Sequence, residues 1–224
     1  MNHEQPQFSN FKMIRALGGV GILCGLLIVF TYEATFDIIK EKKAIALEKA
    51  IYDVLPGSSS KLTFQVLEDG SFKKTEHVEE GKTRVFAGLD DQGNLVGFAV
   101  EASGNGFQDI IRVIYGFSHE QESLVGLKVL ESKETPGLGD KIEKDEQFLM
   151  NFVALDVKLG PSGKELLHPI ELVKPGKKTD AWQIDSITGA TISSKAISNI
   201  LGKSSQVWIP RIQKNVQEVK DQVQ

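Results

Sequence analysis

The sequence contains few of the side chains that bind transition metals. It has one cysteine, Cys24, among 224 residues. A single cysteine excludes an intrachain disulfide, a cysteine-ligated iron–sulfur cluster and a cysteine-ligated structural zinc site. The four histidines are scattered, without HxxxH or HxH spacing: His3, His77, His119 and His168. We therefore predict no metal site, and surface or loop positions for these histidines.

An excess of positive charge is also missing. Lys and Arg number 26 against 30 Asp and Glu, which gives a formal net charge of −4. A nucleic-acid surface normally needs a clearly basic chain, so we predict no nucleic-acid partner. The sequence also lacks a GxGxxG dinucleotide fingerprint and an evident acid/base pair, which disfavours an independent enzyme acting on a small molecule. We accordingly assign no catalytic residue and expect no substrate turnover by this chain alone.

A long hydrophobic run is present near the N-terminus. Residues 16–32 carry no charge, and a helix that spans a bilayer needs about 17–25 apolar residues. Lys12 and Arg15 precede the run, and the positive-inside rule places residues 1–15 in the cytoplasm. This pattern predicts a single-pass anchor in the cell inner membrane, with the rest of the chain on the periplasmic (extracytoplasmic) side.

A cleaved signal peptide is the alternative interpretation of this run. Its apolar core would be about 7–15 residues long and would lead into a small-x-small cleavage site. Here the run is longer and its exit reads TYEATF, without an Ala-x-Ala, which favours the uncleaved anchor. Lys40, Lys42 and Lys43 weaken the orientation argument, because they are positive charges close to the far end of the run.

Short elements of both kinds follow the anchor. Apolar periodicity predicts a helix over 34–55, within a linking segment 33–57 that ends at Pro56-Gly57. Runs typical of β-strands, bounded by turn residues, then cover 62–67, 84–89, 95–102, 109–118 and 123–132. A short helix over 143–153 is expected to turn Phe148, Leu149 and Phe152 inward.

The C-terminal region predicts a second long helix from about residue 192. Ile192, Ala196 and Ile200 mark one face of it, and we expect Gly202 and Pro210 to break it. The residues after the break, 213–224, read as a polar tail. The fold class is therefore α+β, with one domain over 58–212 built as a twisted antiparallel sheet packed by helices.

The run DSITGAT at 185–191 carries the chemistry. It is a small, polar turn that leads directly into the C-terminal helix, with Thr191 at the expected N-cap. Helix N-termini bind anions, so a phosphate here would meet the amides of Ile192, Ser193 and Ser194. Gly189 and Ala190 leave room for close approach, the two serines add hydroxyl donors, and Lys195 adds positive charge. From capping physics alone, the simpler interpretation is an ordinary capped helix.

A resemblance to a known family adds to this interpretation. DSITGAT matches the Asp-x-x-(Ser/Thr)-Gly-Ala-Thr signature of FMN-binding domains that a dedicated transferase flavinylates. SLVGLKVLESKETPGLGDKI at 123–142 resembles the second block of the family, a strand followed by a Glu-Thr-Pro-Gly-Leu-Gly loop. By length and layout the chain resembles the G subunits of Rnf electron-transport complexes (RnfG, also called RsxG). The resemblance covers about residues 10–212.

The resemblance implies an FMN joined to Thr191 by a phosphoester and a flavin transferase as a partner during maturation. It also implies the other subunits of a membrane redox complex as lasting partners. The loop would lie against the isoalloxazine ring, with Thr135 as a polar contact and Leu138 as the apolar one. In this interpretation Asp185 and Thr188 shape the turn that the transferase recognises. Glu134 and Gly139 are the first and last residues of the loop. For this loop the alternative is a type II turn without a ligand.

Other functions stay open at this point. An NqrC-like component of a sodium-pumping NADH:quinone reductase would share both motifs. A membrane-tethered sensor or structural module, with flavin absent or incidental, would share the anchor. Four aromatic residues could stack on a flavin, although a buried aromatic is more often part of the core: Tyr115, Phe117, Trp182 and Trp208.

Overall fold

A computed structural model describes residues 10–76 and 82–223. His3, His77 and the first nine residues of the predicted cytoplasmic segment lie outside these ranges. The described residues form two compact units, divided between Ala46 and Leu47. The first unit is part of one long helix, α1 (Asn10–Val54), whose last residues belong to the second unit.

The first unit is a helix whose apolar side chains are not covered by protein. Leu17, Leu26 and Phe30 are among many large apolar side chains of α1 that lie more than half exposed. Among the helices of the described ranges, α1 is the one long and apolar enough to cross a membrane. A continuous apolar surface of this size requires an apolar surrounding, which a bilayer supplies.

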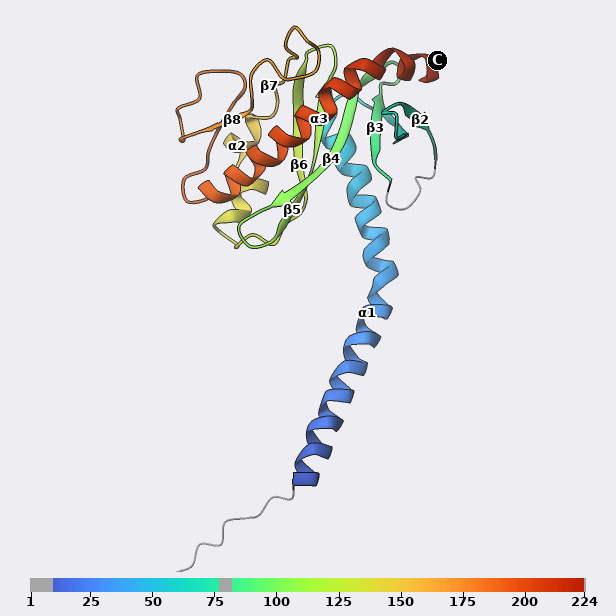
Figure 1. Ribbon diagram of the computed structural model, residues 1–224, viewed down its shortest axis with the longest axis vertical. Helices are drawn as coiled ribbons and strands as arrows, with labels where there is room; N and C mark the ends of the chain where they lie inside the picture. Colours follow the sequence, from blue (N-terminus) through green and yellow to red (C-terminus); the bar gives the residue numbers. More distant parts are fainter. Residues whose placement is uncertain (1–9, 77–81, 224) are drawn as a thin grey trace, which may run out of the picture. The chain divides into compact units, whose positions relative to one another are not determined.

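The second unit is built on a seven-stranded sheet in which every neighbouring pair is antiparallel (Figure 1). The strand order is β2-β1-β3-β4-β5-β6-β7. The strands are β1 (Ser60–Val66), β2 (Phe72–Lys74), β3 (Arg84–Leu89), β4 (Leu95–Asn105), β5 (Ile110–Ser118), β6 (Ser123–Glu131) and β7 (Leu155–Asp156). The predicted α+β class with an antiparallel sheet is confirmed.

One face of the sheet receives the end of α1. Ile51, Val54 and Leu55 are buried there against Phe86, Ala99 and Ile114. Glycines on three strands make this close approach possible, because a Cβ on any of them would overlap Val54 or Leu55: Gly88, Gly116 and Gly126. A Cβ on Gly97 would overlap the carbonyl of Phe117 and press on Leu55 at 3.1 Å. The linking helix predicted from apolar periodicity therefore ends in the core of the second unit.

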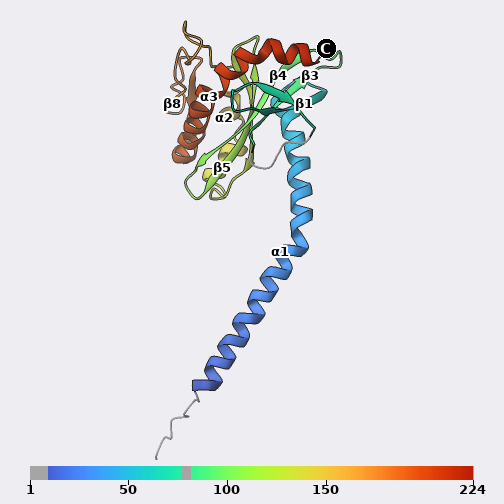
Figure 2. The same ribbon diagram turned by 45° about the vertical axis from the view of Figure 1, so that its right-hand side comes forward.

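The other face is covered by α3 (Thr191–Val223), which lies across β4 (Figures 1 and 2). The predicted break at Gly202 and Pro210 is wrong: α3 continues through both residues. A proline inside a helix removes one hydrogen bond and bends it, and α3 changes direction along its length in Figure 2. Residues 213–223, read from sequence as a polar tail, are the last part of α3, and Val219 is buried in the core.

Short elements complete the second unit. The helix expected over 143–153 is shorter, α2 (Glu146–Met150), and a 3-10 turn (η1, Gly139–Glu143) precedes it. Asp145 caps α2 by accepting a hydrogen bond from the amide of Phe148 at 3.0 Å. Phe148 and Phe152 are buried as predicted, whereas Leu149 is partly exposed. The parallel pair β8 (Glu171–Val173) and β9 (Gln183–Asp185) leads the chain into the turn before α3.

Candidate functional site

The two sequence motifs meet on one cleft of about 360 Å³. The loop after β6 contributes Glu134, Thr135, Leu138 and Gly139, and the turn before α3 together with its first residues contributes 189–193. A third element, the hairpin between β4 and β5, adds Phe107. The 45 residues from 140 to 184 separate the Glu134–Gly139 loop from the 185–191 signature, so their meeting is a property of the fold.

The loop from Glu134 to Gly139 is a tight turn followed by η1. The amide of Leu138 donates to the carbonyl of Thr135 at 3.1 Å, and Gly137 between them has φ +78°. A type II turn with proline first and glycine second has this conformation. Asp140 fixes the turn by accepting a hydrogen bond from the Gly137 amide at 2.7 Å.

Glu134 joins the three elements of the cleft. It is only 6% exposed, and its Oε1 accepts hydrogen bonds from the amides of Phe107 at 2.7 Å and Gln108 at 3.1 Å. Its Oε2 accepts a hydrogen bond from the hydroxyl of Ser193 on α3. A Cβ on Gly139 would overlap this carboxylate, so the glycine is what lets the loop close over Glu134. Glu134 is therefore a structural centre of the cleft, a role that the sequence did not reveal.

The start of α3 differs by one residue from the prediction. The carbonyl of Ala190 accepts the first helical bond, from the amide of Ser194 at 2.9 Å, so Ala190 is the N-cap and Thr191 is the first helical residue. Within the described ranges, the amides of Thr191, Ile192 and Ser193 donate to no backbone or side-chain oxygen. Three free amides and the helix dipole make this end of α3 suited to an anion.

The hydroxyls of Ser193 and Ser194, predicted as donors to a phosphate, make other hydrogen bonds in the structure. The Ser194 hydroxyl is fully buried, donates to the Ala190 carbonyl at 2.9 Å and accepts from the Ile187 amide at 3.1 Å. It therefore stabilises the turn before α3 and lies off the cleft. The hydroxyl of Ser193 is on the cleft, but it is engaged by Glu134.

Three further predicted residues lie outside the cleft. Asp185 and Thr188 line a separate hollow of about 370 Å³ that the turn before α3 also borders. The Asp185 carboxylate accepts hydrogen bonds at 3.0 Å from the amides of Lys177 and Lys178, so it shapes the loop after β8 as well as the motif. Lys195 is exposed on α3 and is not among the residues that line the cleft.

Apolar side chains from three elements surround the mouth of the cleft. Phe107 is 60% exposed, Leu138 53% and Ile192 58%. Large apolar side chains this exposed, gathered from separate elements around one cleft, mark a binding surface. Leu138 and Ile192 were expected from sequence, but Phe107 was missed. The signal available was its place between Gly106 and Asp109, in a turn that the hydrophobic pattern alone does not link to the motifs.

The aromatic residues considered from sequence lie elsewhere. Tyr115 and Phe117 are fully buried in the sheet, and Trp208 is 8% exposed on α3. Trp182 stacks on His168 with the ring centroids 3.8 Å apart. None of these four lines the cleft.

The fold resembles two solved structures of NqrC proteins. The crystal structure of NqrC from Shewanella oneidensis matches 82% of this chain and 98% of its own, with a TM-score of 0.57 and 17% identity. The corresponding component of the Na(+)-translocating NADH-quinone reductase of Parabacteroides distasonis matches 77% and 94%, with a TM-score of 0.59 and 22% identity. At these identities the likeness shows the fold alone.

Sequence comparison gives the family. Residues 106–205, which contain the whole cleft, match the family of FMN-binding domains. The G subunit of the ion-translocating oxidoreductase complex of Methanosarcina acetivorans is 30% identical over 192 residues, which cover 85% of this chain and 89% of that one. The G subunit of the Na(+)-translocating ferredoxin:NAD(+) oxidoreductase complex of Acetobacterium woodii is 26% identical over 207 residues, with coverage of 88% and 91%. The chain therefore belongs to the family of G subunits of ion-translocating oxidoreductase complexes, and it carries the FMN-binding domain of that family.

Proposed function

We propose that this chain carries electrons through an FMN bound to Thr191 by a phosphoester, as a membrane-anchored member of an Rnf-type ion-translocating oxidoreductase. The observation that carries the proposal is the cleft: an exposed threonine begins a long helix and stands beside the Glu-Thr-Pro-Gly-Leu-Gly loop. The other subunits of the complex are the proposed lasting partners, and a flavin transferase is the partner during maturation.

The surroundings of Thr191 fit a phosphate. Its side chain is exposed, and the free amides of Ile192 and Ser193 follow it in the first turn of α3. Gly189, with φ +82°, and Ala190 hold the turn that brings the threonine to the cleft. The dipole of a 33-residue helix adds a favourable field for a negative group at this end.

The mouth of the cleft fits a flat aromatic ring. Phe107, Leu138 and Ile192 offer apolar contacts, and Thr135 offers a hydroxyl that already accepts from Gln108 Nε2 at 3.2 Å. FMN supplies one- and two-electron chemistry when bound, whereas the protein supplies attachment, orientation and electrostatics. The role of Glu134 in this assignment is to hold the hairpin, the loop and α3 in one arrangement.

The domain division predicted from sequence completes the proposal. Residues 1–15 lie in the cytoplasm, 16–32 cross the inner membrane and 33–57 link the anchor to the flavin domain. The flavin domain itself lies on the periplasmic side. Support comes from the uncovered apolar surface of α1 and from Lys12 and Arg15 before it. A covalent bond to flavin suits this side, because a dissociated cofactor would be lost to the outside.

The NqrC-like alternative has support from the fold alone, since the two solved NqrC chains are 17% and 22% identical. The identity of the neighbouring genes would distinguish the NqrC-like alternative from the Rnf-type assignment. Detection of covalent flavin would count against the sensor alternative, in which flavin is absent or incidental.

The proposal is tested by co-expression of the full chain with a flavin transferase, followed by denaturing gel electrophoresis and in-gel flavin fluorescence. We expect a fluorescent band that Thr191→Ala abolishes. Thr179→Ala is the control, because Thr179 is an exposed threonine that lies outside both the 185–191 signature and the cleft. A wild-type band without flavin, with active transferase present, would refute the covalent assignment.

A further inference from the structure

The strand β4 extends beyond its neighbour on one side. β3 pairs with β4 only from Leu89↔Leu95 to Val85↔Val100. β5 continues on the other side as far as Asn105↔Ile110. Within residues 10–76 and 82–223, the segment 102–105 of β4 therefore pairs with another strand on one side only.

The backbone groups of this segment that face the open side can be assigned. The amide of Gly106 donates to the carbonyl of Asp109 at 2.8 Å, and the register of the β4–β5 pair then runs without a shift. Bonded and non-bonded pairs alternate along an antiparallel ladder. Gly104 consequently bonds to β5, whereas the N–H and C=O groups of Ser103 and Asn105 face away from it. Unpaired edge groups of this kind are a template for an added strand.

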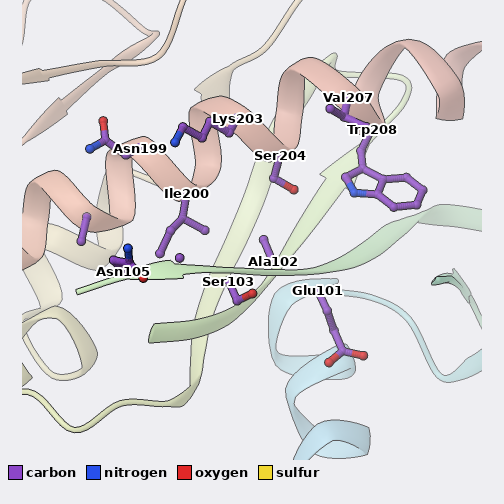
Figure 3. A pocket seen from close by; sticks show the side chains of 12 residues that line it. Glu101, Ala102, Ser103, Asn105, Asn199, Ile200, Lys203, Ser204, Val207 and Trp208 are labelled. Atoms are coloured by element: carbon purple, nitrogen blue, oxygen red, sulfur yellow. The ribbon is translucent and has the colours of Figure 1, made fainter. Parts of the chain in front are cut away.

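A groove of about 430 Å³ lies between this edge and α3 (Figure 3). Trp208 stands toward one end of it, and Asn105 and Asn199 stand toward the other. Val207 is 47% exposed in the wall of the groove, although it is a large apolar side chain on a helix that buries most such residues. An added strand would therefore find an apolar surface under one of its side chains.

The charges around the groove favour an acidic occupant. The carboxylate of Glu101 is already neutralised, by Arg84 at 2.8 Å and Arg112 at 3.0 Å. Lys203 lines the groove and forms no ion pair with any residue that the structure describes. The remaining charge of the groove is therefore positive, and a carboxylate would complement it.

The groove continues the flavin cleft along the same two elements. Phe107 and Ile192 line the cleft, whereas Asn105 and Ala196 line the groove. Asn105 and Phe107 are close together on the hairpin. Ile192 and Ala196 are about one turn apart on α3. A chain bound in the groove would thus lie next to the cleft proposed for the flavin.

We propose that the groove binds an extended, acidic segment of another subunit of the complex, which adds to β4 as a short strand. Its backbone bonds to Ser103 and Asn105, an apolar side chain lies against Val207 and Trp208, and a carboxylate pairs with Lys203. The proposal rests on the proposed function in that it requires a multisubunit complex. It places the partner close to the electron-carrying site.

The test uses the full chain assembled with the subunits encoded beside it. A photoreactive benzophenone amino acid replaces Val207 in one sample and Gln217 in the matched control. Gln217 is exposed on the same helix but lies outside the groove. We expect the Val207 probe to cross-link to another subunit and the Gln217 probe to give little product. Cross-links from Val207 only to this chain, or none in the assembled complex, would overturn the proposal.

Two substitutions test the chemistry of the contact. Ser103→Pro removes an N–H that faces the open side, so the pairing of β4 with β5 is kept. Lys203→Glu reverses the charge, with Lys214→Glu as its control on the same helix and outside the groove. We expect Ser103→Pro and Lys203→Glu each to reduce the cross-link yield about tenfold, the scale of one lost hydrogen bond or ion pair in an interface. Equal yields for Lys203→Glu and Lys214→Glu would contradict the acidic occupant.

Flavin fluorescence of the same gel bands keeps the two proposals separate. None of these substitutions is on the flavin cleft, so the covalent flavin is expected to be unchanged. If the Val207 probe gives no cross-link while the band keeps its flavin, docking alone is refuted. If the probe cross-links while the band carries no flavin, the phosphoester is refuted and docking is supported.

Discussion

The carboxylate of Glu134 is the contact whose removal best tests how the cleft is held together. Glu134→Ala deletes the acceptor of three hydrogen bonds, from the amides of Phe107 and Gln108 and from the Ser193 hydroxyl. Hydrogen bonds to a charged acceptor contribute about 1.5–3 kcal/mol each. Phe107 and Gln108 are exposed, so water can replace part of this loss. We therefore expect the free energy of unfolding to fall by about 3–5 kcal/mol, below the full sum of three bonds.

Glu134→Gln separates the contribution of the hydrogen-bond geometry from the contribution of the negative charge. The glutamine carbonyl can still accept from both amides, and its NH2 group can donate to the Ser193 hydroxyl after that hydroxyl rotates. Only the charge assistance is lost, so the expected cost is about 1–2 kcal/mol. Glu165→Ala, at an exposed loop position, is the control and should change the free energy by less than about 0.5 kcal/mol.

The assay is urea unfolding of the full chain in a non-ionic detergent, followed by the fluorescence of Trp182 and Trp208. The proposed flavin attachment to Thr191, assayed with the transferase present, gives a second measurement, because the same carboxylate holds the loop and α3 beside one another. The reasoning fails if Glu134→Ala unfolds with the wild-type free energy, or if the alanine and glutamine variants are equally destabilised. In either case the three elements would be held by other contacts.

Two other predictions concern glycine packing and a buried histidine. Gly116→Ala should lower the free energy of unfolding by about 2–4 kcal/mol, because the new Cβ would overlap the backbone of Val54. Gly202→Ala should raise the free energy of unfolding by about 0.5–1 kcal/mol in the same urea experiment, because its Cβ would meet no atom within 4 Å and alanine favours the helix. Burial holds the pKa of the His119 imidazole below its ordinary value, and Lys220 adds to this shift whereas Glu120 opposes it. The unfolded chain therefore binds more protons than the folded chain as the pH falls through about 6.5, so the free energy of unfolding should fall over that range. The decrease should be smaller in His119→Phe, and an unchanged slope in that variant would contradict the assignment.

The sequence predicted the elements whose patterns are local. The β-runs at 84–89 and 123–132 are β3 and β6 to within a residue. The two motifs were recognisable because each is a short run with its own turn chemistry. Glycine at 137 and 189 stands where the backbone adopts a positive φ, a requirement that few other residues meet.

The residues that sequence reasoning missed or misassigned depend on which way a side chain points after folding. Ser193 and Ser194 are neighbours of one type, yet one faces Glu134 and the other the interior of the turn. Helical periodicity could have separated them only if the register of α3 against the sheet had been known. Pro210 was read as a helix end because its local cost is high. Burial of Ile209, Ile212 and Val219 against the sheet offsets that cost, and the helix bends instead of ending.

The shape of the cleft gives a physical reason for a covalent attachment. Sites that hold a small ligand by non-covalent contacts alone usually bury about 70–90% of its surface. Here Phe107, Leu138 and Ile192 are each more than half exposed, and Thr191 itself faces solvent. An open mouth of this kind leaves the ring within reach of a partner, but it holds a free cofactor weakly. The proposed phosphoester resolves this conflict, because it removes dissociation without requiring the cleft to close over the ring. Under this proposal, the hydrogen bonds of Glu134 would orient the ring, and the open side would stay available for electron transfer.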